Sequence, residues 1–349
     1  MARIRRVDCS GPGIRRRRRG RSFSYEEPDG RPLRDPEALA RIRALAIPPA
    51  WKDVWICPIA SGHLQAVGTD AAGRRQYLYH EAWRTRRDAV KFDHMLEFAH
   101  ALPGLRDRAA EHLAQDGLTR ERVLACATRL LDRGFFRMGT EGYAEQNQTY
   151  GLATIQKRHI RLDGDLITFD YVSKSGKRRL ASVLDPAVRE VVAQLKRRRG
   201  GPDLLAFKRG RAWVDVRSDD INDYIKEQTG GDFTAKDFRT WGATVLAAVA
   251  MASSFPQARS KTARARAISR AVQEVAHYLG NTPAVCRASY IDPRVFDRYR
   301  SGLTIAGALE QLGEVEELGE PAHQGAIEAA VLDLIEEKRG LAPELDLIA

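Results

Sequence analysis

Apolar and polar positions alternate with a period of two in several short stretches between residues 21 and 90. The stretches VWICPI, HLQAVGTD and RRQYLYH are separated by Ser-Gly and Ala-Gly turns, a pattern typical of antiparallel strands. Before them, DPEALARIRAL has apolar residues at helical spacing, with Asp35 as its N-cap and Pro36 in its first turn. The pattern therefore predicts a small N-terminal domain over residues 1–90, an antiparallel β-sheet with helices.

From about residue 91 the apolar period becomes helical. Helices are predicted to begin at caps such as Thr119 and to end at glycines such as Gly134. The exception is residues 159–185, where Asp-Gly and Ser-Gly turns separate alternating segments and predict a three-stranded sheet. The sequence thus predicts an α+β protein whose larger domain, residues 91–349, is mainly helical and carries that sheet. Its last part, residues 310–349, is predicted as an acidic C-terminal helix that packs on the body.

Charge is spread unevenly along this pattern. The formal net charge is +11, yet 11 acidic and only two basic residues lie from Glu310 onward, so residues 1–309 carry a net +20. A field of that size attracts polyanions, of which nucleic acid is the usual one, although a solvated surface without a partner is the alternative. The run Arg15–Arg19 lies beside Gly11, Pro12 and Gly13, so residues 1–20 are expected to be a flexible basic tail. This tail is either solvated or clamps phosphate groups.

Cysteine and hydropathy patterns narrow the class of protein. The four cysteines form no CxxC pair and no zinc spacing with the eight histidines, as expected for a reduced chain with structural thiols. No apolar run reaches 18 residues, and the basic N-terminus lacks an apolar signal core. We therefore expect a cytoplasmic, nucleoid-associated protein without a membrane span.

Three cations stand at positions suited to binding an anion. Arg137 follows a predicted helix end, Lys174 lies at the tip of the YVSKSGKRR hairpin with Lys177 nearby, and Arg239 lies in the first turns of a helix capped near Thr234. A helix N-terminus and a guanidinium together favour anion binding. Each residue alone is more typical of a structural or solvated role.

A polar residue and a tyrosine complete this set. Gly280 is predicted to end one helix, and Thr282 to cap the next, so Asn281 lies at a junction and Tyr290 just past the second helix. Arginine, hairpin lysine, helix-start arginine, and a polar donor nine residues before a tyrosine form the constellation of enzymes that cut DNA with tyrosine. Arginines neutralise charge on the phosphate oxygens, lysine protonates the leaving 5′-oxygen, and tyrosine forms a covalent ester.

These motifs resemble the bacterial type IB DNA topoisomerases of the short, poxvirus-like group. KDFRTWGAT and LGNTPAVCRASYIDP carry the resemblance most specifically, and IPPAWKDVWICP, GRRQYLYHEAWR, FFRMGTEGYAEQNQTYGLATIQKRHI and VSKSGK agree in the same order. The resemblance covers about residues 8–310. The resemblance implies that Tyr290 is the nucleophile, that Arg137 and Arg239 are the catalytic arginines, and that Lys174 is the general acid. Asn281 occupies the fifth catalytic position, which is histidine in poxvirus relatives.

The resemblance also implies DNA contacts in both domains. Gln76, Tyr77 and Tyr79 match a DNA-contacting strand of the N-terminal domain, and Tyr143 matches a contact in the catalytic domain. Alternation places Tyr77 and Tyr79 on one face and Gln76 on the other; packing of both tyrosines into the sheet core is the alternative. Thr140 stands where poxvirus enzymes have a lysine, which argues against poxvirus-type cleavage-site specificity.

The resemblance implies a monomer that closes as a C-shaped clamp around double-stranded DNA. One strand is cut through a 3′-phosphotyrosyl link, the duplex rotates, supercoils relax, and the strand is rejoined without nucleotide, cofactor or metal. A tyrosine recombinase shares the catalytic layout, but usually has LGH where this chain has LGN, and a helical N-terminal domain. A basic nucleic-acid-binding protein without enzymatic activity, with Tyr290 buried, is the second alternative.

Overall fold

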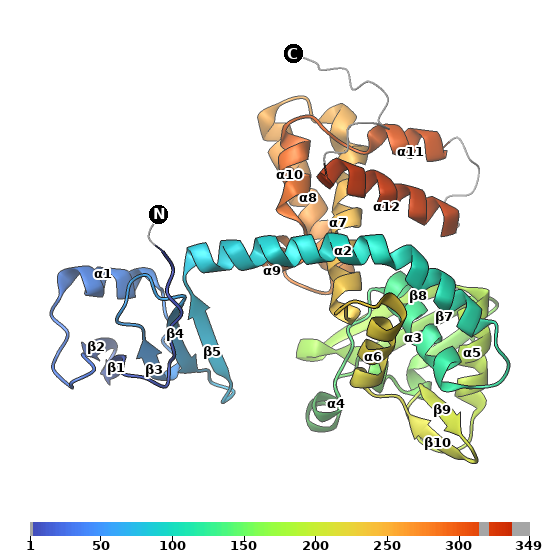
Figure 1. The fold of residues 1–349 in the computed structure, drawn as a ribbon, viewed down its shortest axis with the longest axis horizontal. Helices are drawn as coiled ribbons and strands as arrows, with labels where there is room; N and C mark the ends of the chain where they lie inside the picture. The colour runs from blue at the N-terminus through green and yellow to red at the C-terminus, as the bar shows by residue number, and fades with distance from the viewer. Residues whose placement is uncertain (1–2, 314–320, 337–349) are drawn as a thin grey trace. The chain divides into compact units, whose positions relative to one another are not determined.

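The computed structural model describes residues 3–313 and 321–336, apart from a few side chains in that range. Its backbone separates into two compact units, Met1–Phe92 and Asp93–Ala349. Helix α2 (Glu81–Leu113) begins in the first unit and ends in the second, so continuous helical backbone joins them (Figure 1). Within the described residues, no helix combines the length and apolar character needed to cross a membrane.

The first unit is a five-stranded antiparallel sheet with helix α1 packed on it (Figure 1). The strand order is β2-β1-β3-β4-β5. As predicted, Asp35 caps the helix, because its carboxylate accepts hydrogen bonds from the backbone N–H groups of Glu37 and Ala38. Ile42 of the helix is buried against Val54 and other apolar residues of the sheet. The elements are β1 (Ile14–Arg19), β2 (Ser22–Glu26), α1 (Pro36–Ala44), β3 (Lys52–Ile56), β4 (Leu64–Thr69) and β5 (Arg75–Tyr79).

The expectation of a flexible basic tail over residues 1–20 is wrong. The arginine run lies in strand β1, which pairs with β2 from Arg15 to Arg19 and with β3 at its start. Ile14 is buried in the sheet core, so it anchors the strand. Arg16 lies over the Phe23 ring at 4.3 Å and donates a hydrogen bond of 2.7 Å to the Trp51 carbonyl. The half-buried stem of Arg16 therefore packs as an apolar side chain would, while the other arginines of the run are exposed.

The second unit is mainly helical and carries two small antiparallel sheets. The three-stranded sheet has the order β6-β7-β8, as predicted for residues 159–185, and the α+β class is confirmed. Beyond α2, the helices are α3 (Arg120–Gly134), α4 (Glu141–Asn147), α5 (Pro186–Arg197), α6 (Ser218–Thr229), α7 (Ala235–Ser254), α8 (Lys261–Leu279), α9 (Pro283–Ser289), α10 (Pro293–Arg300), α11 (Ala306–Gly313) and α12 (Pro321–Glu336). The strands are β6 (Ile160–Asp163), β7 (Leu166–Ser173), β8 (Lys177–Leu184), β9 (Ala206–Arg209) and β10 (Ala212–Asp215).

The core of the second unit lies around α3 and α7. Helix α3 packs against α5, α6 and α7, and Trp241 of α7 is among its largest fully buried side chains. The predicted cap Thr119 is confirmed, because its hydroxyl accepts from the Arg122 N–H, and Asp185 caps α5 by accepting from the Val188 N–H. Helix α2 begins ten residues earlier than the expected change at residue 91, and the β9–β10 hairpin and α6 were not predicted.

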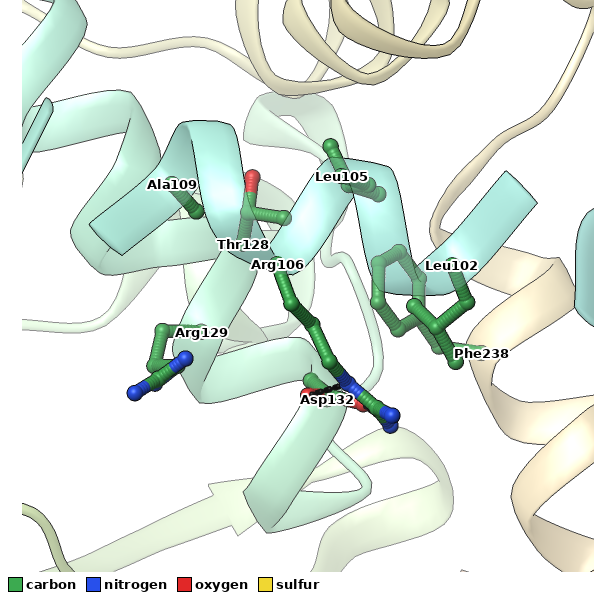
Figure 2. A pocket seen from close by; sticks show the side chains of 8 residues that line it. All are labelled: Leu102, Leu105, Arg106, Ala109, Thr128, Arg129, Asp132 and Phe238. Carbon is green, nitrogen blue, oxygen red and sulfur yellow. Dashed lines mark hydrogen bonds and ion pairs between the residues drawn. The ribbon is translucent and has the colours of Figure 1, made fainter. Parts of the chain in front are cut away.

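The C-terminal helix α12 is held by a buried ion cluster. In the described part of the predicted segment 310–349, α12 contacts α7, α10 and α11 and buries Val331 (Figure 1). Figure 2 shows Arg106 of α2 reaching to Asp132 of α3, beside Phe238. The same guanidinium pairs with Glu328 of α12 at 2.6 Å. Burial lowers the pKa of Arg106, but the hydrogen bonds that it donates to Glu328 and Asp132 outweigh burial and hold the pKa above its usual value. Residues 337–349 lie outside the described chain.

Candidate active site

Arg137 lies in a loop that two glycines hold tightly to a neighbouring segment. Helix α3 ends at Phe135, whose backbone is left-handed with a φ of 51°. Two residues later, the carbonyl of Arg137 accepts a hydrogen bond of 2.8 Å from the Leu152 N–H. A Cβ atom on Gly151 would lie 2.4 Å from the backbone nitrogen of Gly139, so the two chains approach closely enough to require glycine. This packing fixes the backbone that carries Arg137.

Arg239 projects from the first turns of α7. The helix starts at Thr234, whose hydroxyl accepts from the Lys236 N–H, while the Asp237 carboxylate accepts from the Thr234 N–H. The Arg239 side chain is buried, and its guanidinium donates to the carbonyl of Phe135 at 2.5 Å and to that of Leu279 at 2.9 Å. Arg239 therefore ties the end of α3 to the end of α8.

The junction between α8 and α9 places Asn281 and Tyr290 as predicted. Gly280 ends α8 with a φ of 63°, and the Thr282 hydroxyl accepts from the Val285 N–H at the start of α9. Tyr290 follows α9, where its N–H donates to the Cys286 carbonyl at 2.9 Å. Its side chain is half-buried, and the Arg239 guanidinium carbon lies 5.5 Å from the centroid of its ring. Tyr290 is thus not enclosed in packing.

Four of the five predicted catalytic residues line a single cleft of about 290 Å³. These are Arg137, Lys174, Arg239 and Tyr290. The fifth, Asn281, touches this group, since the Arg137 guanidinium donates to its side-chain oxygen and to the Gly280 carbonyl at 3.0 Å. The Asn281 side-chain nitrogen is buried and has no hydrogen-bond partner among the described residues. The structure therefore brings all five side chains together.

The cleft is strongly cationic. Burial lowers the pKa of Arg239, and the nearby positive charge of Arg137 lowers it further. The two guanidinium groups repel each other, so an anion bound between them would be stabilised. No carboxylate or imidazole lines this cleft in the part of the chain that the structure describes. Its chemistry suits a phosphate group beside a phenol.

The hairpin resolves the choice between two lysines. Lys174 is exposed at the turn between β7 and β8 and lines the cleft. Lys177 begins β8 and is absent from the residues that line the cleft where the structure describes it. Lys174 is therefore the hairpin lysine placed to act on a bound group.

Sequence reasoning missed three residues of this region. Lys236, at the start of α7, and Tyr150 line the cleft, and Arg179 is the third. Arg179 of β8 hydrogen-bonds to carbonyls at the ends of α3 and α8. A lysine two residues after the Thr234 cap was a usable signal for Lys236; nothing in the sequence separates Arg179 from its neighbour Arg178.

The predicted DNA contacts of the first unit lie on strand β5. The rings of Tyr77 and Tyr79 stack with centroids 6.3 Å apart, and Tyr77 is 45% exposed. Tyr79 is half-buried against a cluster that includes Trp55, so the core-packing alternative holds in part for it. Gln76 points to the other face, where it donates to Asp70 at 2.9 Å. The side chain of Tyr143, in α4, lies outside the described residues.

Comparison with known families decides the class of the protein. Residues 80–315 match the family model of the eukaryotic DNA topoisomerase I catalytic core. Residues 22–70 match that of the bacterial DNA topoisomerase IB N-terminal domain. The chain belongs to the type IB DNA topoisomerases. It therefore has DNA topoisomerase type I activity with DNA as substrate, as the motifs predicted, and the recombinase and non-enzymatic alternatives fall away.

Viral topoisomerases are similar over much of this type IB chain. DNA topoisomerase 1B of Acanthamoeba polyphaga mimivirus is 29% identical over 298 residues, 83% of this chain and 88% of the viral protein. DNA topoisomerase I of monkeypox virus is 20% identical over 233 residues, 66% and 71% of the two chains. DNA topoisomerase 1B of vaccinia virus (strain Copenhagen) is 26% identical over 108 residues, 31% and 34% of the two chains.

Proposed function

We propose that Tyr290 is the nucleophile with which this topoisomerase cuts one strand of duplex DNA. The phenol oxygen attacks the scissile phosphorus in line with the 5′-oxygen, the P–O5′ bond breaks, and a 3′-phosphotyrosyl ester forms. The phenol proton passes to water, because no carboxylate or imidazole lines the cleft in the described chain. The observation that carries this proposal is the shared cleft of Tyr290, Lys174 and the two arginines.

The other four residues stabilise the charge that develops in this step. Arg137 and Arg239 donate hydrogen bonds to the non-bridging oxygens, where negative charge grows in the transition state. Lys174 gives a proton to the departing 5′-oxygen and takes it back on rejoining. Asn281 orients Arg137 through its side-chain oxygen, which leaves its unpartnered side-chain nitrogen to donate to the phosphate.

The ester conserves the energy of the broken bond, so rejoining needs no nucleotide. The cut strand rotates about the intact one, torsion relaxes, and the 5′-hydroxyl displaces Tyr290 from phosphorus. We propose that the chain acts as a monomer whose two units clamp duplex DNA, with Tyr77 and Tyr79 of the first unit as DNA contacts. The exposed ring of Tyr77 supports this assignment.

Relaxation of supercoiled plasmid in EDTA, without nucleotide, tests the proposal. We expect wild-type protein to relax plasmids of unrelated sequence and to form a covalent adduct with a nicked suicide substrate. Tyr290→Phe should abolish both while it still binds DNA, because only a hydroxyl is lost. Tyr25→Phe, which removes a half-buried hydroxyl of β2 outside the cleft, is the matched control and should retain both activities. Adduct formation by Tyr290→Phe, or a peptide map that finds DNA on another residue, would refute the assignment.

A further inference from the structure

A third arginine, Arg179, is not among the residues that line the cleft, but it contacts the backbone that carries the proposed catalytic residues. It lies on β8 opposite Tyr171 of β7. Its guanidinium donates to the Tyr278 carbonyl at 2.9 Å, and also to the carbonyls of Gly134 at 3.0 Å and Phe135 at 3.2 Å. One side chain therefore joins the end of α3 to the last turn of α8.

The two joined segments lead directly into the site. Arg137 follows Phe135 by two residues, and Asn281 follows Tyr278 by three. Any change in the distance between these segments would thus separate Arg137 from Asn281, which are hydrogen-bonded to each other.

Three consecutive carbonyls at the end of α8 each accept from a different arginine. Tyr278 accepts from Arg179, Leu279 accepts from Arg239, and Gly280 accepts from Arg137. The carbonyls of the last helical turn lack partners within the helix and carry partial negative charge. The end of α8 therefore holds three guanidinium groups close together through adjacent carbonyls.

Arg179 is half-buried, and no Asp or Glu among the described residues pairs with it. Burial lowers its pKa, and the charge of Arg137 also lowers it. Its Nε and the hydroxyl of Tyr171, the facing residue of β7, are both buried. Buried cations are normally paired with carboxylates. A cation held by carbonyls alone adds to the positive field of the cleft instead of cancelling it.

We infer that Arg179 is a positioning residue for DNA cleavage, which holds Arg137 and Asn281 at the spacing needed to engage one phosphate. This inference rests on the active site proposed above. The neighbouring Arg178 has the opposite role: it is exposed and its guanidinium pairs with Asp170 across the hairpin. Alternation along β8 thus separates an arginine of the site from one of the surface.

Single-turnover cleavage of a suicide substrate tests this inference, with variants Arg179→Ala and Arg179→Lys. We expect Arg179→Ala to slow adduct formation by about 10- to 100-fold with an unchanged Kd for DNA, since a small misplacement of catalytic groups has effects of this size. Arg179→Lys should restore part of the rate, because an ammonium group donates hydrogen bonds but lacks the planar fork that reaches three carbonyls.

A matched control separates positioning from loss of stability. Arg122 is a buried arginine that likewise donates to two carbonyls, those of Leu113 at 2.9 Å and Gly117 at 2.8 Å, and it also pairs with Glu190 at 3.0 Å. It lies at the opposite end of α3 from Gly134, about 18 Å along the helix axis at 1.5 Å per residue. Arg122→Ala should lower thermal stability without slowing cleavage by the folded enzyme.

Two readouts distinguish action through Arg137 from any other cause. On a substrate with a neutral methylphosphonate at the scissile position, guanidinium contacts matter less, so the Arg179→Ala deficit should shrink. In a double-mutant cycle with Arg137→Ala, the two losses should be far from additive, because residues that act together are coupled. Additive losses, an equal deficit on both substrates, or a rate like that of Arg122→Ala would overturn the inference. Failure of wild-type protein to form the adduct, or adduct formation by Tyr290→Phe, would instead overturn the proposed function.

Discussion

Gly242 of α7 leaves the space in which the ring of Phe135 lies. A Cβ atom at this position would approach Phe135 Cε1 to 2.6 Å. Carbon atoms in contact normally stay about 3.5–4.0 Å apart, so Gly242→Ala must displace the ring by about 1 Å. Because Phe135 occupies the left-handed region, and its carbonyl accepts from both Arg239 and Arg179, we expect that displacement to move the arginines.

The expected change in stability is small and the expected change in rate is large. Alanine in a helix interior is favoured over glycine by about 0.5–1 kcal/mol. Overpacking costs about 1–3 kcal/mol, so the two effects partly cancel in the free energy of unfolding. A shift of about 1 Å in groups that hold the substrate can slow catalysis about 100-fold. Gly242→Ala should therefore remain folded but cleave a suicide substrate about 100-fold more slowly.

The assay compares cleavage rate and urea unfolding for Gly242→Ala with those for Gly104→Ala. A Cβ built on Gly104 of α2 meets no atom within 4 Å from elsewhere in the described chain, so the control should keep its cleavage rate and gain stability. Adding Phe135→Ala to Gly242→Ala removes the clashing ring and should recover activity. Wild-type cleavage by Gly242→Ala would refute the reasoning, because the ring would then move without its backbone.

Two further predictions concern stability. Arg106→Ala leaves the carboxylates of Asp132 and Glu328 buried without their cation, so urea unfolding should show a loss of about 3–5 kcal/mol. Glu328→Ala should lower the free energy of unfolding by less, because Arg106 stays paired with Asp132. Equal losses for the two variants would contradict this view of the cluster. Burial lowers the pKa of His159 below its unfolded value of 6.5. The stabilising contribution of neutral His159 is therefore complete above pH 6.5 and is lost as the pH falls through the folded pKa. As the pH is lowered below 6.5, the melting temperature of the wild type should fall more than that of His159→Gln.

The helix boundaries of the second unit followed from local chemistry. A hydroxyl or carboxylate at Thr119, Asp185, Thr234 and Thr282 can accept from the N–H groups of the following turn in any context, and each caps a helix in the structure. Strand β1 could not be predicted in this way. Five arginines show no apolar alternation, and their place in a sheet depends on partners such as Phe23 and Trp51, which lie elsewhere in the chain.

The candidate site depended on resemblance more than on periodicity. Spacing alone placed Lys174 at a hairpin tip and Tyr290 after a short helix, but it gave no reason for them to meet. Their common cleft results from the packing of separate elements, which a single sequence does not encode locally. Arg178 and Arg179 show this limit, because they are adjacent arginines of β8 with different environments. Arg178 forms a surface ion pair, whereas Arg179 contacts the backbone of the site.

The pairing of β1 has a practical consequence for protein engineering. A run of arginines at the start of a chain invites deletion, to simplify purification or crystallisation. Deletion before Gly20 would take Ile14 out of the hydrophobic cluster and strip β2 of its neighbour. It would also leave β3 as an unprotected edge, and bare edges recruit other chains into aggregates. Shortened versions of this enzyme should therefore begin upstream of the strand.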